Sequence, residues 1–423
     1  MTRSIEVDSS LFLRVPRVWL QAALQLNRSE RTRAAAQATA AVVDNIQRRL
    51  ALPSIQRDPT AARASRESTT PPRRNITNLQ AAMANFSKTT PGSGGDLDSE
   101  FHSLTEYLMT TLKDQELTVL MSQMALACKA TSRACAKAGI ANLFGMAGDQ
   151  NSSGDDQKKL DVLSNDIFVN ALLKSGSCCV LVSEENEEPI LVPEKDAGRF
   201  CVCFDPLDGS SNIDCNVSTG TIFAVYEKKT PGKLGSVADV LRVGSDIVAA
   251  GYCMYGAATE LVLCFKGQSV QRFALDPSLG EFVHTHSNVT FPAGGGKKIY
   301  SCNEGNFPYW DQPIKDAVTE FKAKKYALRY VGSMVSDVHR TILYGGVFVY
   351  PADSKSPKGK LRVLYEGFPM ALLVECAGGK ASTGMFNGSV QRMLDLEPTH
   401  VHERCPVILG SPRDVDFILS KYN

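Results

Sequence analysis

Residues 201–214, CVCFDPLDGSSNID, carry the most information about the fold of this protein. An apolar run leads into Asp205, and the Pro-Leu-Asp-Gly text that follows predicts a turn. The segment therefore predicts a β-strand that ends in two carboxylates, Asp205 and Asp208, which face one mouth. Two carboxylates this close repel each other unless a cation lies between them. Hard oxygen ligands of this kind suit Mg²⁺ or Mn²⁺.

The next three residues, Gly209, Ser210 and Ser211, are typical of the start of a helix. The free N–H groups and the dipole at a helix start favour a bound phosphate. One short segment would thus supply both cation ligands and an anion cradle, which metal-assisted hydrolysis of a phosphate ester requires. The structural alternative is an Asp-Gly turn followed by an ordinary N-cap.

Further acidic residues lie where predicted elements begin or end. Glu184 and Glu185 follow a predicted strand at 180–183, and Glu366 follows one at 361–365. Asp161 lies at the predicted junction between a loop and a helix. Each of these acids alone is typical of a surface, but acids at several strand ends favour a shared metal site.

Working outward, the chain predicts an α/β fold with some hairpin strands, without a clean βαβ series. The predicted helices cover residues 101–111, 117–138, 161–174, 314–325, 334–344 and 369–377. The predicted strands cover residues 180–183, 200–204, 221–226, 247–255, 260–265, 298–302, 346–350 and 361–365. His339 lies inside a predicted helix, so we expect a structural histidine there and not a general base.

Composition excludes several classes of protein. The chain has 423 residues, 43% hydrophobic content and a formal charge of +1. These values exclude wholesale disorder and give no case for a nucleic-acid partner. The lack of an apolar run of membrane length argues against a membrane span or a secretory signal. Without such a signal, we expect the twelve cysteines to be reduced thiols.

The near-neutral total hides a basic N-terminal extension. Residues 1–95 hold 14 basic and 6 acidic side chains, a balance of +8, and the remainder holds 32 and 39, a balance of −7. We interpret residues 1–97 as a basic low-complexity extension that is disordered or removed. The alternative is an organelle-targeting segment, since such segments are rich in Arg and Ser. We expect a cytoplasmic protein, with an organelle as the alternative.

Seven segments resemble the fructose-1,6-bisphosphatase family, in order from about residue 101 to 422. They are KKLDVLSND, VSEEN, FDPLDGSSNID, NEG, RYVGSMVSDVHRT, YGGVFVYPADSKSPKGKLRVLYE and HERCPVILGSPRDV. The resemblance implies a layered αβαβα sandwich of the sugar phosphatase type. Its two subdomains would be 98–285, with the metal site, and 286–423, with the sugar-phosphate site. The implied activity is Mg²⁺-dependent hydrolysis of the 1-phosphate of fructose 1,6-bisphosphate. A sedoheptulose-1,7-bisphosphatase, an inositol- or nucleotide-phosphate phosphatase of the wider family, and a catalytically inactive interaction protein are the alternatives.

The resemblance also implies roles for individual residues. Two to three Mg²⁺ ions per subunit, or Mn²⁺, would be held by Asp161, Glu184, Glu185, Asp205, the carbonyl of Leu207, Asp208 and Glu366. Asp161 and Glu185 would orient and deprotonate the attacking water, and Asp155 would belong to a mobile loop that closes for catalysis. Substrate contacts are implied for Asp208, Gly209, Ser210, Ser211, Asn303, Arg329, Tyr330, Met334, Tyr350, Lys360 and Arg362. Arg329 would reach the site of a neighbouring subunit, which implies a homotetramer.

The chain departs from animal-type relatives at the positions that bind AMP. Those relatives carry a Lys-Tyr pair where this chain has Arg199-Phe200, and an Arg where it has Glu227. The loop at 113–118 is also a few residues shorter than the corresponding loop of those relatives. A carboxylate facing a phosphate is repulsive, so we expect weak or absent inhibition by AMP. Residues 228–246 contain no Cys, which argues against the thioredoxin control of light-regulated chloroplast forms.

Overall fold

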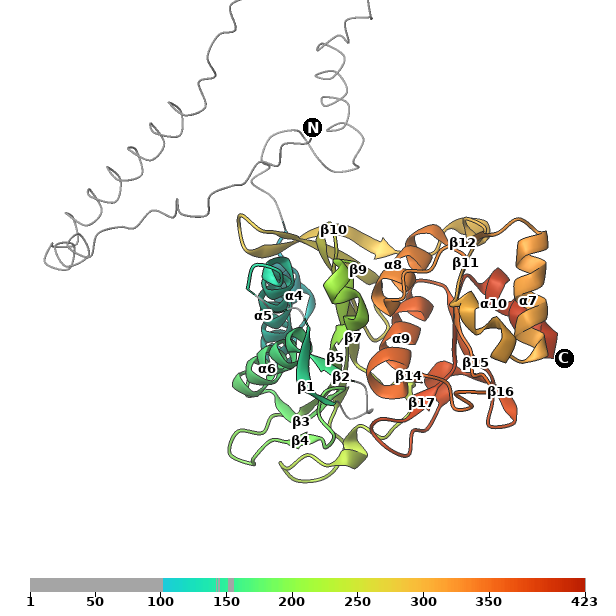
Figure 1. Cartoon of the computed structure of the whole chain (residues 1–423). Helices are drawn as coiled ribbons and strands as arrows, with labels where there is room; N and C mark the ends of the chain where they lie inside the picture. Colours follow the sequence, from blue (N-terminus) through green and yellow to red (C-terminus); the bar gives the residue numbers. More distant parts are fainter. Residues whose placement is uncertain (1–101, 142, 144, 151–155, 423) are drawn as a thin grey trace, which may run out of the picture. The chain divides into compact units, whose positions relative to one another are not determined.

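A computed structural model describes residues 102–141, 143, 145–150 and 156–422 (Figure 1). The predictions for the extension at 1–97 and for Asp155 lie outside these residues. Within them, no helix is long and apolar enough to cross a membrane.

The first sheet has eight strands in the order β10-β9-β8-β7-β6-β5-β3-β4. Only β3 and β5 pair in parallel; the other neighbours are antiparallel. The strands are β3 Cys178–Ser183, β4 Ile190–Leu191, β5 Phe200–Asp208, β6 Thr219–Glu227, β7 Ala249–Tyr255, β8 Thr259–Phe265, β9 Val270–Asp276 and β10 Glu281–Val289. The β9–β10 hairpin was absent from the sequence prediction, because the exposed half of β10 has few apolar residues to mark a strand.

Helices cover both faces of this sheet (Figure 1). On one face lie α4 Leu104–Thr111, α5 Gln115–Lys137 and α6 Lys159–Lys174, whose apolar sides share a core with the sheet. Ser103 and Asp114 cap the first two of these helices by accepting backbone N–H groups. On the other face, α8 Met334–Tyr344 and α9 Phe368–Cys376 share a second core with the sheet.

A second sheet of six strands lies beyond α8 and α9, in the order β12-β11-β13-β18-β15-β16. Its strands are β11 Ile299–Ser301, β12 Ala327–Leu328, β13 Val347–Tyr350, β15 Lys380–Phe386, β16 Ser389–Arg392 and β18 Val407–Gly410. Helices α7 Gln312–Ala323 and α10 Pro412–Leu419 cover its outer face through a third core. The layers therefore alternate helix, sheet, helix, sheet, helix, and the predicted αβαβα sandwich is confirmed.

Two local predictions at the site were wrong. The strand predicted at 200–204 does not stop before the first carboxylate; β5 continues to Asp208, with an irregular register between Asp205 and Asp208. This irregularity lies beside Pro206, which has no N–H to donate to the neighbouring strand. The turn comes at Gly209, and the helix after it is a 3₁₀ segment, Ser210–Cys215.

The predicted strand at 361–365 is also shorter than expected. Only Leu361–Arg362 (β14) is extended, and it pairs with β17 Arg404–Cys405. The chain then forms one π-helical turn, Val363–Gly367, which contains Glu366. The backbone N–H of Arg362 donates to the Glu366 carboxylate at 2.6 Å, and this bond stabilises the turn.

The cysteines are consistent with the reduced state. All twelve are free thiols, and most are buried among apolar side chains of the two sheets. Cys201 and Cys203 lie on the same face of β5, because side chains two residues apart on a strand share a face.

Candidate active site

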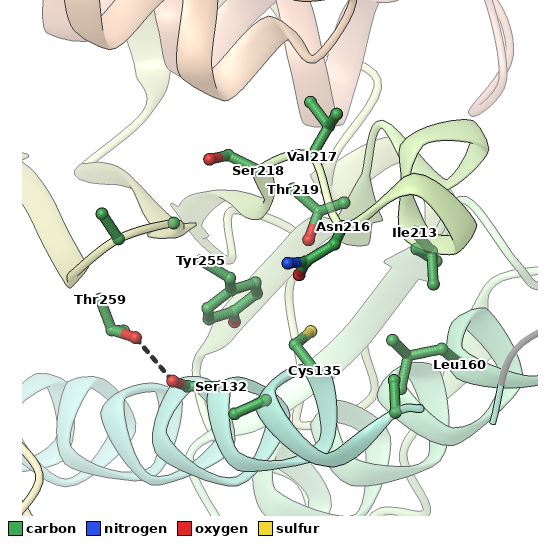
Figure 2. Close-up of a pocket in the computed structure, with 14 residues that line it drawn as sticks. Ser132, Cys135, Leu160, Ile213, Asn216, Val217, Ser218, Thr219, Tyr255 and Thr259 are labelled. Atoms are coloured by element: carbon green, nitrogen blue, oxygen red, sulfur yellow. Dashed lines mark hydrogen bonds between the residues drawn. The ribbon is translucent and has the colours of Figure 1, made fainter. Parts of the chain in front are cut away.

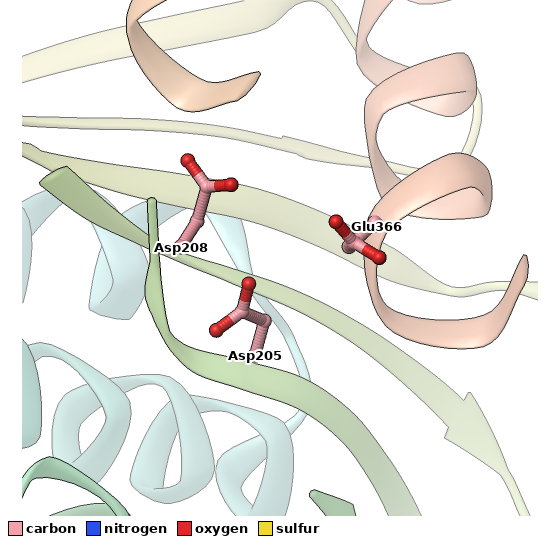
Figure 3. A group of neighbouring side chains, drawn as sticks. All are labelled: Asp205, Asp208 and Glu366. Carbon is pink, nitrogen blue, oxygen red and sulfur yellow. The ribbon is translucent and has the colours of Figure 1, made fainter. Parts of the chain in front are cut away.

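Three buried carboxylates meet between the first sheet and α9. Oxygen atoms of Asp205, Asp208 and Glu366 all lie within 4.8 Å of one another (Figure 3). The first two come from the end of β5, and the third from the π-helical turn. Segments about 160 residues apart in the sequence thus build one acidic cluster.

Hydrogen bonds fix the orientation of each carboxylate. Asp208 accepts from the Ser333 hydroxyl at 2.8 Å and from the backbone N–H groups of Met334 at 3.3 Å and Val335 at 3.0 Å. These donors form the first turn of α8, so the carboxylate also benefits from the helix dipole. Asp205 accepts from the Leu207 N–H at 2.9 Å. These bonds do not exclude a further ligand, since each carboxylate oxygen has more than one lone pair.

Burial and mutual repulsion raise the pKa of these acids. Burial is the main cause at each position, and the charge of Glu184 adds to it. The pKa is about 6 for Asp208, about 8 for Glu366, and well above its ordinary value for Asp205. A divalent cation bound between these buried carboxyl groups would stabilise their ionised forms.

Asp161 provides an independent test of whether the site fits a metal. It lies in the first turn of α6, where one oxygen accepts from the Lys158 N–H at 2.9 Å. The other oxygen, Oδ1, is buried and has no hydrogen-bond partner. Burial, assisted by Glu184, raises the pKa of Asp161 to about 6. A buried oxygen without a partner, beside further carboxylates, fits a hard cation such as Mg²⁺.

A cavity of about 530 Å³ opens over these carboxylates and collects most of the predicted site. Its walls include Asp161, Glu184, Glu185, Asp205, Leu207, Asp208, Gly209, Ser210, Ser211, Asn303, Tyr330, Met334, Tyr350, Lys360 and Glu366. Five of these acids precede residue 209 and the sixth, Glu366, comes from the π-helical turn, whereas Tyr330, Tyr350 and Lys360 come from the second sheet and its loops. The cavity therefore joins an acidic cluster that can hold a cation with side chains whose chemistry suits a phosphate or a hydroxyl.

Two predicted residues, Arg362 and Arg329, are not among the described residues that line the cavity. Arg362 is buried beside it, where its guanidinium donates to the Lys360 carbonyl at 2.8 Å and lies 4.0 Å from Glu184. Arg329 is exposed and lines a separate hollow with Lys297, Lys298 and Arg340. Asp155 lies outside the described residues.

The turn at Gly209 accepts only glycine. Its φ is +75°, and a Cβ there would lie 2.8 Å from the Ser333 Cβ. The side-chain amide of Asn212, one turn later, donates to the Gly332 carbonyl at 3.2 Å. The 3₁₀ segment is thereby held against the start of α8, and both of its serines, Ser210 and Ser211, face the cavity.

Some residues that shape the site were not predicted from the sequence, because they do not lie at the end of a strand. Ser333 holds Asp208, and Asp337 accepts from the Val331 and Gly332 N–H groups, each at 3.0 Å. Lys158 lines the cavity and pairs with Asp214 at 2.8 Å. A serine just before an apolar helix is an N-cap signal, so Ser333 could have been found; its bond to Asp208, 125 residues away, could not.

A second cavity, of about 360 Å³, lies between α5, the segment after the 3₁₀ turn and the β7–β8 turn (Figure 2). Among its described lining residues none is acidic or basic, and Ser132 and Thr259 bond to each other across it at 2.6 Å. It lacks the charged groups that phosphate chemistry needs, so the acidic cavity is the candidate active site.

Comparison with known proteins agrees with this geometry. Residues 103–287 match the family described as "Fructose-1-6-bisphosphatase, N-terminal domain", and residues 295–423 match "Fructose-1-6-bisphosphatase, C-terminal domain". A protein of a Saccharum hybrid named "Fructose-1,6-bisphosphatase, cytosolic" is 54% identical over 326 residues, which is 76% of this chain and 92% of that protein. A Spinacia oleracea protein of the same name is 50% identical over 340 residues, 78% of this chain and 97% of its own length.

Solved structures show the same similarity. The holo form of Leishmania major fructose-1,6-bisphosphatase aligns with a TM-score of 0.72 and 42% identity. The alignment covers 76% of this chain and 99% of that one. Both halves of the sequence, the fold and the site geometry therefore agree, and the chain belongs to the fructose-1,6-bisphosphatase family.

Proposed function

We propose that this protein hydrolyses the 1-phosphate of fructose 1,6-bisphosphate in a reaction that depends on Mg²⁺ and yields fructose 6-phosphate and phosphate. The observation that carries the proposal is the single cavity in which a buried acidic cluster faces Lys360, Tyr330 and Tyr350. A sugar with a phosphate at each end needs both surfaces, because metals hold one phosphate and basic or phenolic groups must hold the other.

Two to three Mg²⁺ ions, with Mn²⁺ as a substitute, would neutralise charge on the transferring phosphate and on the leaving oxygen. Asp161, Glu184, Glu185, Asp205, Leu207, Asp208 and Glu366 are the proposed ligands. Asp161 and Glu185 would also orient the attacking water and accept its proton. A pKa of about 6 leaves Asp161 mainly ionised at neutral pH, in the state needed to accept a proton. The Gln157 amide donates to the Glu185 carboxylate at 2.6 Å and fixes its orientation.

At the other end, Asn303, Lys360 and two tyrosines would bind the sugar and its 6-phosphate, and Met334 would line the sugar pocket. Burial raises the pKa of Tyr330 and Tyr350, so both phenols stay protonated and serve as donors. Ser210 and Ser211, with Gly209, would hold the 1-phosphate, with Arg362 beside them. Removing Lys360 (Lys360→Ala) should raise KM more than it lowers kcat if the ammonium mainly binds the ground-state substrate.

We further propose that residues 98–285 and 286–423 act as the metal and the sugar-phosphate subdomain of a homotetramer. Arg329 is exposed and lies outside the acidic cavity of its own subunit. In a homotetramer it would reach the site of a neighbouring subunit. Asp155 would act from the loop that lies outside the described residues. We place the protein in the cytosol, as the names of its relatives do for those proteins.

We propose that AMP inhibits this enzyme weakly or not at all. Arg199 is already bound by three carboxylates: Asp114, Glu116 at 3.1 Å and Glu227 at 2.6 Å. A phosphate arriving here would have to displace one of these acids and approach the others. An AMP inhibition constant below about 1 µM on the purified protein would contradict this proposal.

Phosphate release from purified protein tests the main proposal. We expect Mg²⁺-dependent release from fructose 1,6-bisphosphate, with slower release from sedoheptulose 1,7-bisphosphate and from an inositol monophosphate. Faster release from either alternative substrate would reassign the activity, and no release from any of the three would favour an inactive interaction protein. A Glu185→Gln variant with the wild-type rate would refute the proposed role of Glu185.

A further inference from the structure

A network of four polar side chains joins α8 to the first sheet, away from the candidate active site. His339 on α8 contacts the Tyr252 hydroxyl on β7 through Nδ1 at 2.8 Å, and the Glu260 carboxylate on β8 through Nε2 at 3.1 Å. Arg272 on β9 donates two hydrogen bonds to the same carboxylate, at 2.9 and 2.5 Å. One helix is thereby tied to three neighbouring strands.

The hydrogen bonds fix the role of each ring nitrogen. An ionised carboxylate only accepts, so His339 Nε2 donates to Glu260, and in the neutral ring Nδ1 accepts from the Tyr252 hydroxyl. Burial alone would raise the pKa of Glu260, but its bonds to His339 and Arg272 lower it to about 2. Both side chains are about nine-tenths buried, at 10% and 12% exposure. The link is therefore specific in geometry and shielded from water.

The first turn of the same helix, N-terminal to His339, holds a proposed metal ligand. The first turn of α8, at Ser333, Met334 and Val335, supplies three donors to the Asp208 carboxylate. The helix approaches the sheet closely there, because a Cβ on Gly220 would lie 2.7 Å from the Val335 methyl groups. Gly220 is also the register partner of Asp208 across β5 and β6. A small shift of α8 along the sheet would therefore move the donors off Asp208.

We propose that His339 and Glu260 are positioning residues that fix α8 against the first sheet, so that its first turn holds Asp208 in a metal-binding orientation. Neither residue lines the acidic cavity, so both act through the helix. The inference rests on the proposed metal-dependent function. Outer partners of metal ligands commonly change metal affinity by about 10- to 100-fold when they are removed.

The test compares metal binding and catalysis in the full-length protein. Free Mn²⁺ is titrated by electron paramagnetic resonance, and activity is measured against Mg²⁺ concentration. We expect His339→Leu to raise the Mn²⁺ dissociation constant and the half-activating Mg²⁺ concentration about tenfold, with kcat recovered at saturating Mg²⁺. His339→Gln keeps a donor for Glu260 and an acceptor for Tyr252, so it should restore most of the affinity.

His284→Leu is the matched control. His284 lies on β10 of the same sheet and bonds to Gln271 at 2.9 Å, away from α8, so its loss should leave both metal constants unchanged. Equal metal constants in His339→Leu and wild type, with only a lower melting temperature, would overturn the inference. Wild-type protein that binds no Mn²⁺ would overturn the proposed function together with it.

A milder variant covers the case in which His339→Leu does not fold. Tyr252→Phe removes one hydroxyl and leaves the packing of β7 in place. We expect its Mn²⁺ dissociation constant to rise about two- to threefold, below the range for a direct outer partner. A constant equal to that of wild type would overturn the inference.

Discussion

The two ends of β5 carry acidic clusters that differ in one respect. At the start of the strand, Asp114, Glu116 and Glu227 surround the guanidinium of Arg199. At its end, Asp205 and Asp208 meet Glu366, and the charge of Arg362 lowers the pKa of Glu366 without cancelling the rise that burial causes. The first cluster contains its own cation at its centre. The second has the geometry of a cluster that can hold cations from solution, which agrees with the metal-dependent function that we propose.

The pKa directions express the same contrast. Burial raises the pKa of Asp114, but hydrogen bonds from Arg199 and from backbone N–H groups lower it further, so the pKa lies below its ordinary value. At the other end, burial together with neighbouring acids raises the pKa of Asp205, Asp208 and Glu366. The acids around Arg199 are stabilised as charged groups by contacts within the protein. The acids at Asp205, Asp208 and Glu366 have raised pKa values, which is typical of a site that binds a ligand.

The largest expected effect comes from Asp205→Asn. Removing this charge from the acidic cluster should lower kcat/KM by about 10²–10³-fold, since one proposed ligand to the transition-state charge is lost. The same change relieves repulsion among buried acids, so the metal-free variant should melt at a temperature equal to or above that of metal-free wild type. Phosphate release and thermal unfolding in chelator measure the two effects. A lower melting temperature with full activity would show that the cluster of Asp205, Asp208 and Glu366 is structural and does not serve catalysis.

The pH dependence of metal-free stability should come next in size. Asp161, Asp208 and Glu366 have folded-state pKa values of about 6, 6 and 8, above those of exposed acids. The folded state therefore binds more protons, and the stability that these groups contribute is present near pH 4 and lost as the pH rises to about 8. We expect the urea midpoint in chelator to fall over this window. Mg²⁺ should restore the midpoint at pH 8, and a midpoint that rises with pH in chelator would contradict the raised pKa values.

The Arg199 cluster should respond in the opposite manner. Arg199→Met leaves three carboxylates without their cation, while kcat should stay unchanged because the cluster lies at the far end of β5. Arg199 is 39% exposed, so solvent screening limits the expected loss to about 1–2 kcal/mol of unfolding free energy. Urea unfolding at fixed Mg²⁺ gives the value. A loss of activity without a loss of stability would mean that this end of the strand serves catalysis.

The contrast also explains what the sequence could predict. The apolar run before Asp205, and the strand before Glu184, are local signals, so the acids at these strand ends were found. The partners that decide the role of each cluster come from distant segments: Ser333 is 125 residues from Asp208, and Arg199 is 85 from Asp114. The π-helical turn at Glu366 depends on a backbone bond that apolar periodicity does not encode. Local pattern therefore located the chemistry, and tertiary contacts determined its use.

The smallest expected effect belongs to Glu227→Gln, which removes the most exposed acid around Arg199. Its carboxylate is 49% exposed, and Arg199 keeps its bonds to Asp114 and Glu116. The unfolding free energy should therefore fall by less than about 1 kcal/mol. If carboxylates around Arg199 exclude a phosphate, the loss of one should also raise the affinity for AMP slightly, measured by inhibition of phosphate release. An AMP response equal to that of wild type would show that the Glu227 carboxylate has no part in excluding the nucleotide.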